Sequence, residues 1–313
     1  MWIPNDVPEQ TNKEEMREAY EKGSKVALEV LKHAKDIIKP GKKALDYAEE
    51  IESLIISSEM KLGFPVNISV DNIAAHYTPT INDELVFNDK MVVKVDIGIS
   101  SQGYIIDFAF TADLSGKHDK LLLAAAQALK NGVAKIKKDT NTSEIGEIIE
   151  RTISDNGFKP IANLTGHMLK KNNLHAGISI PNVKSPKGYK MQKDDVFAIE
   201  PFATTGRGYV EELDQIEIFS VGTPTTPRLR HVREVLEYLK KEHPYLPFSE
   251  RSLHKKFNSR LIVSTAIREL LLNGTLVPYP VLADNGVVSQ FETTVIVDDD
   301  GCNEIVPVEK IIS

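Results

Sequence analysis

Two β-rich segments in the first half of the chain, Lys94-Val95-Asp96-Ile97-Gly98-Ile99 and Gly103-Tyr104-Ile105-Ile106-Asp107-Phe108, flank a Ser-Ser-Gln-Gly turn. This pattern predicts an antiparallel hairpin folded about Ser101-Gln102, with Asp96 directly opposite Asp107. Opposed side chains in such a hairpin have Cβ atoms only about 5 Å apart, and like charges at that distance repel. Two carboxylates in an otherwise apolar hairpin therefore need a neutralising partner, either a shared proton or a divalent cation.

Three further residues of the metal-ligand type stand in strands or at strand edges, namely His167, Glu200 and Glu292. His167 follows a glycine in a Gly-rich stretch, and Glu200 ends the apolar run 196–199. Glu292 on its own could equally be an outward-facing residue of an alternating strand. Carboxylates and imidazole together suit divalent cations, so the set of five favours a metal centre over a shared proton.

Composition limits the class of protein. With 313 residues, of which 41% are hydrophobic, the chain can form one large domain or two smaller ones. The net charge of −7 argues against general binding to nucleic acid or to a membrane surface. A single cysteine, Cys302, fits a reducing compartment. No apolar run reaches about 18 residues, and residues 1–6 lack the layout of a signal peptide, so we expect a cytoplasmic protein.

Periodicity and turn residues predict an α+β order of elements. Helices are expected at 12–39, 44–60, 118–136 and 142–156, and strands at 66–70, 72–76, 91–113, within 158–204, at 287–297 and at 305–311. This order of helices, strands, helices and strands suggests two related halves around one mixed or antiparallel sheet. Since the ligand candidates come from both halves, the site is expected at their junction.

Residues 222–278 differ in composition and are predicted to be an inserted helical subdomain, with helices near 228–242, 249–257 and 262–272. From 227 to 260 there are nine Lys or Arg and four Glu, a local charge of +5 in an acidic chain. The layout resembles a winged helix, but the third helix offers only Arg268 and Glu269 as charged groups, which argues against DNA reading. The histidines His33, His118, His231, His243 and His254 lie in charged helical surroundings and are interpreted as solvated.

Taken together, these motifs resemble the type 2 methionine aminopeptidases, in their short archaeal-like form. The resemblance covers nearly the whole chain and rests on Gly63-Phe64-Pro65-Val66-Asn67, Ala74-Ala75-His76-Tyr77-Thr78-Pro79, Val95-Asp96-Ile97-Gly98, Ile106-Asp107, Gly166-His167, His175-Ala176-Gly177, Phe197-Ala198-Ile199-Glu200-Pro201 and Gln290-Phe291-Glu292-Thr293. It implies the pita-bread fold, two pseudo-symmetric halves forming a catalytic domain of residues 1–221 and 279–313, with the type 2 subdomain inserted at 222–278.

The resemblance also implies a role for each site residue. Asp96 would chelate one divalent ion, Asp107 and Glu292 would bridge two ions, and His167 and Glu200 would hold the second. Glu200 would also move the proton of the attacking water. His76 and His175 would contact the scissile amide, and the side chains lining the methionine pocket would be Phe64, Leu174 and Tyr279. Cobalt, manganese, iron and zinc all suit this ligand set.

The implied activity is removal of the initiator methionine from nascent polypeptides, with preference for a small second residue, by a monomer. Two other interpretations stay open, a prolidase-type dipeptidase with the same ligands and a non-catalytic relative that binds RNA or ribosomes. The basic insertion could contact the ribosome. One departure from the family pattern is Thr293, where histidine is usual; that histidine is not a ligand, so metal binding is expected to survive.

Overall fold

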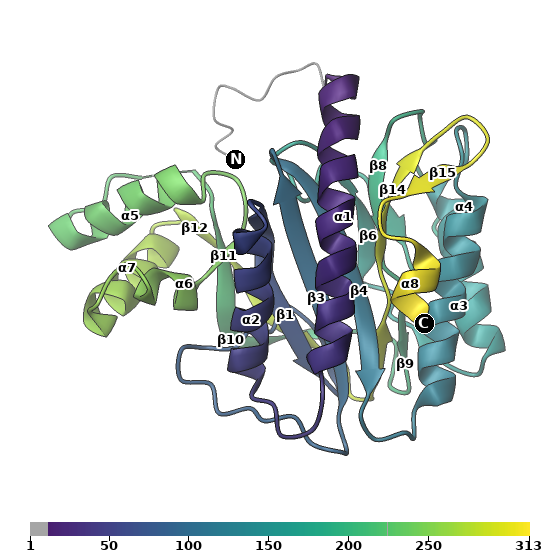
Figure 1. Ribbon diagram of the computed structural model, residues 1–313, viewed down its shortest axis with the longest axis horizontal. Coiled ribbons are helices and arrows are strands. Elements are labelled where there is room, and N and C mark those ends of the chain that lie inside the picture. The colour runs from purple at the N-terminus through teal and green to yellow at the C-terminus, as the bar shows by residue number, and fades with distance from the viewer. Residues whose placement is uncertain (1–11, 224) are drawn as a thin grey trace.

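The computed structural model describes residues 12–223 and 225–313, so the signal-peptide argument for residues 1–6 lies outside the described residues (Figure 1). Its first half packs helices α1 (Lys13–Ile37) and α2 (Ala44–Ser57) on the antiparallel sheet β1-β3-β4. The strands span Lys61–Val70, Val92–Ser101 and Tyr104–Asp113. Asn12 caps α1 by accepting from the backbone N–H of Glu14 and Glu15. Figure 1 shows α1 lying across β3 and β4, with α2 beside β1.

The second half has a similar composition of elements. Helices α3 (Asp119–Lys135) and α4 (Thr142–Asp155) pack on each other beside the antiparallel sheet β15-β14-β8-β6-β7. A capping box formed by Asn141 and Glu144 starts α4. The remaining strands and the last helix are short, and their bounds are β2 Ile73–Ala75, β5 Lys159–Pro160, β6 Thr165–Leu169, β7 Ser179–Pro181, β8 Val196–Ile199, β9 Phe202–Thr204, β13 Val288–Gln290, β14 Thr293–Val297, β15 Cys302–Glu304 and α8 Val308–Ile312.

The two halves join through β4 and the segment just before β14. Ala109 and Glu292 form a backbone bridge with N···O distances of 3.0 and 3.2 Å in the two directions. The Thr294 hydroxyl accepts from the Asp107 N–H at 2.8 Å and donates to the Asp107 carbonyl at 2.9 Å. A single hydrophobic core then runs from α1 through both sheets to α8. Every strand pairing among the described residues is antiparallel.

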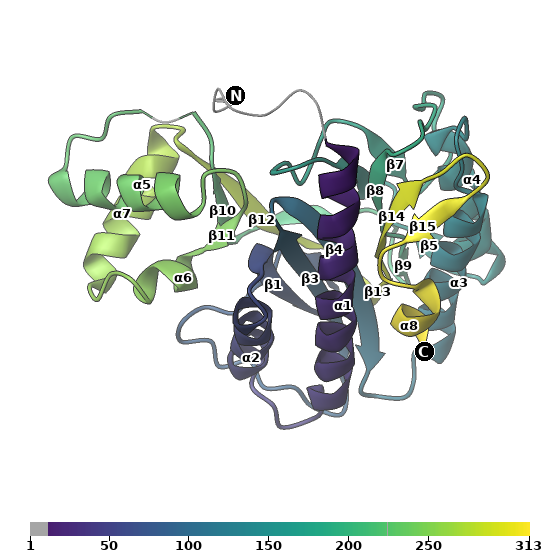
Figure 2. The same ribbon diagram turned by 45° about the horizontal axis from the view of Figure 1, so that its top comes forward.

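A smaller lobe projects from one side of this body (Figure 2). It contains α5 (Arg230–Glu242), β11 (Phe248–Ser249), α6 (Glu250–His254) and α7 (Arg260–Leu272), and β10 (Glu211–Val221) and β12 (Leu276–Ala283) connect it to the body. Its apolar residues, among them Val235, Leu253 and Leu270, form a hydrophobic core of their own. Because β10 and β12 pair with each other, the chain leaves and re-enters the body at neighbouring points.

The predicted register of the central hairpin is wrong by one residue in its turn. Ser101 pairs with Tyr104, so the turn residues are Gln102 and Gly103, with φ of 54° and 90°. Two positive φ values in a two-residue turn are typical of type I′, which matches the twist of the flanking strands. Asp107 consequently faces Gly98, and Asp96 faces Ala109. The two aspartates are therefore diagonal neighbours on one face, and not the directly opposed pair that was predicted.

Two other predictions need correction. The segment 305–311, expected to be a strand, instead forms a bend followed by helix α8, because β15 already ends at Glu304. The Glu304 carboxylate accepts from the Val308 N–H at the start of this helix. The histidines of the insertion are less solvated than predicted. His254 has a side chain only 7% exposed, and burial lowers the pKa of His243 to about 4. Along residues 12–223 and 225–313 no helix combines the length and apolar character needed to cross a membrane.

Candidate metal centre and catalytic cavity

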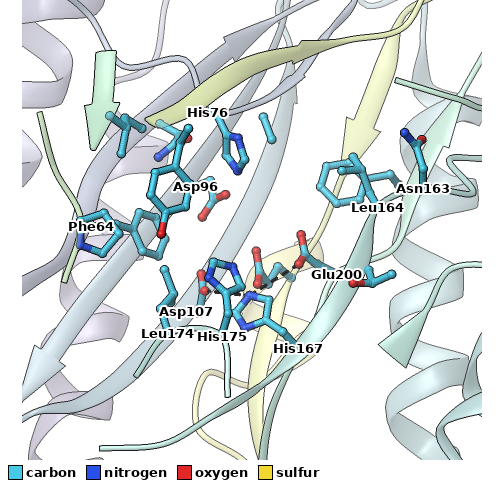
Figure 3. A pocket seen from close by; sticks show the side chains of 18 residues that line it. Phe64, His76, Asp96, Asp107, Asn163, Leu164, His167, Leu174, His175 and Glu200 are labelled. Atoms are coloured by element: carbon cyan, nitrogen blue, oxygen red, sulfur yellow. Dashed lines mark ion pairs between the residues drawn. The ribbon is translucent and has the colours of Figure 1, made fainter. Parts of the chain in front are cut away.

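All ten site residues expected from the sequence line one cavity of about 220 Å³ (Figure 3). The cavity lies at the junction of the two halves, and the ten residues are Phe64, His76, Asp96, Asp107, His167, Leu174, His175, Glu200, Tyr279 and Glu292. They come from β1, β3, β4, β6, β12 and from the segments that follow β2, β6, β8 and β13. Segments more than 200 residues apart along the chain therefore meet in one place, as the order of elements predicts.

The five ligand candidates reach the cavity from adjoining strands. Asp96 and Asp107 project from the first-half sheet, while His167 and Glu200 lie in and just after two paired strands, β6 and β8, of the second half. Gly166 permits the close approach of β6 and β8, since a Cβ there would lie 2.5 Å from the Ala198 carbonyl oxygen. The strand pairing therefore delivers ligands from both sheets to the same point.

Carboxylate and imidazole atoms gather at this point within metal-binding distance of one another. Ligand atoms of Asp107, His167 and Glu292 all lie within 4.8 Å of each other. The His167 Nε2 atom is 3.6 Å from an oxygen of Asp107 and 3.6 Å from an oxygen of Glu200, the two contacts dashed in Figure 3. Asp96 joins the group through the Gln290 amide, whose nitrogen is 3.4 Å from Asp96 and 3.1 Å from Glu292.

Four carboxyl groups lie in the cavity, and their ionised forms need a positive charge nearby. Burial raises the pKa of Asp96 to about 7, and burial together with the neighbouring carboxylates raises the pKa of Asp107, Glu200 and Glu292 well above its ordinary value. Burial also lowers the pKa of His167 to about 3, so its imidazole is neutral and free to bind a metal at neutral pH.

Unpartnered polar atoms support the same conclusion. Within the described part of the chain, one side-chain atom each of Asp96, Asp107, His167 and Glu292 is buried without a hydrogen-bond partner. Buried polar atoms are nearly always paired, so such a concentration needs an explanation, and a bound ion is a common one. The oxygen-rich set with one imidazole fits divalent cations of the first transition row.

Beside the carboxylates, three histidines and one tyrosine form a continuous group of rings. His167 and His175 have ring centroids 4.5 Å apart, His175 stacks on Tyr279 at 6.4 Å, and Tyr279 meets His76 edge-on at 5.6 Å. Burial lowers the pKa of His175 to about 4 and lowers the pKa of His76. Both imidazoles are thus neutral at pH 7. His175 can offer an N–H donor to a bound substrate, whereas the single N–H of His76 donates to the Pro280 carbonyl at 3.0 Å and leaves Nε2 as an acceptor.

The apolar part of the cavity lies beyond these rings. Phe64 packs flat against Gly98, where a Cβ would lie 2.4 Å from the Phe64 ring. In Figure 3 Phe64 and Leu174 lie on one side of the acidic group, and Asn163 and Leu164 lie on the other. The two sides can therefore hold two different parts of an extended ligand.

Several residues of the site were not predicted. Gln290, which donates to Asp96 and Glu292 without lining the cavity, could have been found, because it stands two residues before Glu292. Pro247 lines the cavity from within the insertion, together with the neighbouring Ile218 of β10. No sequence signal marks Pro247, because its place depends on how the insertion packs on the body.

Thr293 points away from the acidic group. It is fully buried, its hydroxyl donates to the Val306 carbonyl at 2.5 Å, and it does not line the cavity, whereas its neighbour Glu292 does. The expectation that metal binding survives the change from histidine stays a prediction.

Comparison with known proteins agrees with this geometry. The model of metallopeptidase family M24 matches residues 14–239. The chain is 42% identical over 288 residues to a methionine aminopeptidase of Thermococcus onnurineus, covering 91% of this chain and 97% of the relative. It is 40% identical over 289 residues to a methionine aminopeptidase of Methanocaldococcus jannaschii, again covering 91% of this chain and 97% of the relative.

Solved structures agree at the level of the fold. A thermophilic Arx1 superposes with a TM-score of 0.80 at 17% identity, over 96% of this chain and 94% of that one. The methionine aminopeptidase of Thermotoga maritima superposes with a TM-score of 0.68 at 19% identity, over 95% and 97% of the two chains. The fold is therefore the pita-bread fold, and the chain belongs to metallopeptidase family M24, with the methionine aminopeptidases as its relatives at about 40% identity.

Proposed function

We propose that this protein removes the initiator methionine from nascent polypeptides by metal-assisted hydrolysis. The observation that carries the proposal is the cavity in which five buried ligand candidates adjoin three neutral rings and an apolar pocket. Identity of about 40% to methionine aminopeptidases over nine-tenths of the chain supports this activity over that of a prolidase.

Two divalent ions would be held by the five ligand candidates. Asp96 would help to hold one ion, His167 and Glu200 would help to hold the other, and Asp107 and Glu292 would contribute to both. Such ions supply Lewis acidity, which lowers the pKa of bound water and stabilises negative charge on the scissile carbonyl oxygen. Cobalt, manganese, iron and zinc all suit the donors.

The protein's own groups orient the substrate and move protons. The Glu200 carboxylate accepts a proton from the attacking water and delivers it to the leaving amine. Neutral His175 donates an N–H to the carbonyl oxygen of the scissile bond, where charge develops. The single N–H of neutral His76 donates to the Pro280 carbonyl, so its other ring nitrogen, Nε2, accepts from the N–H of the scissile amide. Because burial holds both imidazoles neutral, these contacts are available without a change of protonation at pH 7.

The side of the cavity formed by Phe64, Leu174 and Tyr279 receives the methionine side chain. A flexible thioether packs well against aromatic rings and fits irregular apolar space. On the opposite side, Asn163 and Leu164 approach the position of the second residue, which favours a small side chain there.

Hydrolysis of a Met-Ala-Ser peptide tests the proposal. Metal-stripped protein should be inactive, and titration with Mn²⁺ or Co²⁺ should restore methionine release, while Ala-Pro stays intact. Cleavage of Ala-Pro alone would move the protein to the prolidases. If neither peptide is cleaved although metal is bound, a non-catalytic relative that binds RNA or ribosomes would be the better explanation.

The organisation of the chain belongs to the same proposal. Residues 1–221 and 279–313 act as the catalytic domain of a cytoplasmic monomer, and 222–278 act as an inserted subdomain. Exposed basic groups of the insertion would contact ribosomal RNA, namely Arg228, Arg230, Lys240, Lys241, Lys255 and Lys256. Neutralising all six should weaken ribosome co-sedimentation and its salt dependence. Unchanged co-sedimentation would remove the ribosome contact and leave the enzyme proposal intact.

A further inference from the structure

Arg251, in the first turn of α6, is an insertion residue buried in the body of the protein. Its side chain is 2% exposed and forms a two-pronged ion pair with Glu52 of α2, at 2.7 Å from Nη1 and 2.9 Å from Nη2. The Glu52 side chain is 7% exposed. In Figures 1 and 2, α6 is the insertion helix that lies toward α2. The planar guanidinium matches a carboxylate in this geometry, which a lysine cannot reproduce.

The same guanidinium holds the segment that follows His76. Its Nε donates to the Pro79 carbonyl at 2.9 Å, and Nη2 donates to the Thr78 hydroxyl at 3.3 Å. The Thr78 hydroxyl in turn donates to the Val66 carbonyl at 2.8 Å, and Thr78 is fully buried. Arg251 thus fixes the backbone two and three residues beyond His76.

His76 needs such support because its backbone is strained. Its φ of 66° lies in the left-handed region, which residues other than glycine rarely adopt and keep only when the surroundings enforce it. The His76 ring is held at Nδ1 by the Pro280 carbonyl at 3.0 Å, in the strand by which the chain leaves the insertion. The insertion therefore holds the backbone that follows His76, and strand β12, which follows the insertion, holds the His76 ring.

We propose that Arg251 is a positioning residue that acts through His76, with Glu52 orienting the guanidinium. The inference rests on the proposed function, in which His76 contacts the scissile amide. In this view the insertion is part of the catalytic apparatus, because its buried arginine sets the backbone that presents a substrate-contacting imidazole. Since that imidazole acts where charge develops, displacement of its ring should lower kcat more than it raises KM.

Kinetics with conservative variants test the proposal. Arg251→Lys keeps the charge and loses the fork, and its kcat should fall roughly tenfold or more, since small displacements of a catalytic group have large effects on rate. Arg260→Lys is the matched control, because Arg260 also joins the insertion to the body, through an exposed hydrogen bond from its Nη2 to the Asn82 side chain at 3.0 Å. Its kcat should equal that of the wild type.

A double-mutant cycle separates positioning from simple structural support. If Arg251 acts through His76, Arg251→Lys should change kcat little in a His76→Ala background. Full additivity of the two losses would overturn the proposal. So would an Arg251→Lys variant that melts at a lower temperature yet keeps wild-type kcat well below that temperature, because the arginine would then only fasten the insertion.

A spectroscopic measurement decides the inference independently of turnover. The imidazole signals of His76 in a ¹H–¹⁵N spectrum, assigned through His76→Ala, should shift in Arg251→Lys and stay in place in Arg260→Lys. Unchanged His76 signals in Arg251→Lys would overturn the proposal. Wild-type protein that fails to cleave Met-Ala-Ser with metal present would instead overturn the proposed function, and the spectrum would still report on the link between Arg251 and His76.

Discussion

Two places in this molecule bury ionisable groups, and they do so in opposite ways. In the cavity, Asp96, Asp107, Glu200 and Glu292 are four carboxyl groups whose pKa is raised by burial, and several of their atoms lack partners among the described residues. Under the insertion, Arg251 and Glu52 neutralise each other and nearly all their hydrogen-bonding groups are used.

The cavity is therefore a site that needs a bound ligand, whereas the pair of Arg251 and Glu52 is already neutralised within the chain. Buried charge without a partner is costly and shifts its own pKa, so it persists only where something outside the chain neutralises it. A buried ion pair with full hydrogen bonding needs nothing further. The contrast makes the cavity the place for chemistry and the Arg251 contact a fixed support.

The largest expected effect comes from removing one charge in the cavity. Asp107→Asn should abolish bound metal and lower the rate of methionine release by roughly a thousandfold or more, since even groups that only support metal ligands contribute about 10- to 100-fold. The fold should remain, because the substitution removes a repulsive charge. Metal analysis and Met-Ala-Ser hydrolysis measure the two losses together.

The same substitution elsewhere in strand β4 provides the control. Asp113→Asn lies at the end of the strand, outside the cavity, and should keep both metal and turnover. Full turnover in Asp107→Asn would disprove the proposed ligand set.

The next effect should come from opening the Arg251 contact. Glu52→Leu leaves Arg251 buried with only the half-exposed Glu49, 3.8 Å away, as an acidic neighbour. Removing one partner of a buried pair typically costs about 3–5 kcal/mol. Replacing both, as Glu52→Leu with Arg251→Met, should recover much of that loss in a urea-unfolding experiment. If Glu52→Leu alone is as stable as the wild type, water already reaches the pair of Arg251 and Glu52.

A smaller, graded effect concerns pH. The pKa of Asp96 and of the other cavity carboxyls is raised in the metal-free fold, so these groups hold protons below about pH 7 that a cation must displace. Metal affinity should therefore rise with pH by about tenfold per unit for each proton displaced. Calorimetry in buffers of different ionisation enthalpy should show proton release near pH 6. Binding that releases no protons there would mean that the carboxyls are already ionised.

The smallest effect should come from removing the exposed ion pair beside the contact of Arg251 and Glu52. Lys255 pairs with Glu49, and their side chains are 56% and 40% exposed. Exposed pairs contribute about 0–1 kcal/mol because water and salt screen them. Lys255→Ala should thus leave the unfolding free energy within about 1 kcal/mol of the wild type. A loss comparable to that of Glu52→Leu would erase the distinction between the two pairs.

The site was more predictable than the way the insertion attaches to it. Metal ligands are few in kind, and Asp96, Asp107, His167, Glu200 and Glu292 stand at strands where a buried acid or imidazole needs a partner. Their chemical type therefore marks them in the sequence. The family resemblance supplied His76, His175 and the pocket residues, which have no such mark of their own.

What could not be predicted depends on tertiary packing. Arg251 was grouped with the exposed basic residues of 227–260, because nothing in its neighbourhood tells a buried arginine from a solvated one. The hairpin register was off by one residue because Ser101-Gln102 and Gln102-Gly103 are both plausible turns, and only strand twist favours the second. His243 and His254 were misjudged for the same reason as Arg251.

The bridge between Ala109 and Glu292 has a consequence for how the protein is made. The contact between Asp107 and Thr294 spans 187 residues, and closing so long a loop has to await nearly the whole chain. A ribosome still translating the last strands carries a polypeptide whose first half can be folded but whose acidic cluster is incomplete. The acidic cluster can therefore be completed only after Glu292 and Thr294 have been made, and an intermediate of translation that lacks them cannot hold the full set of ligand candidates.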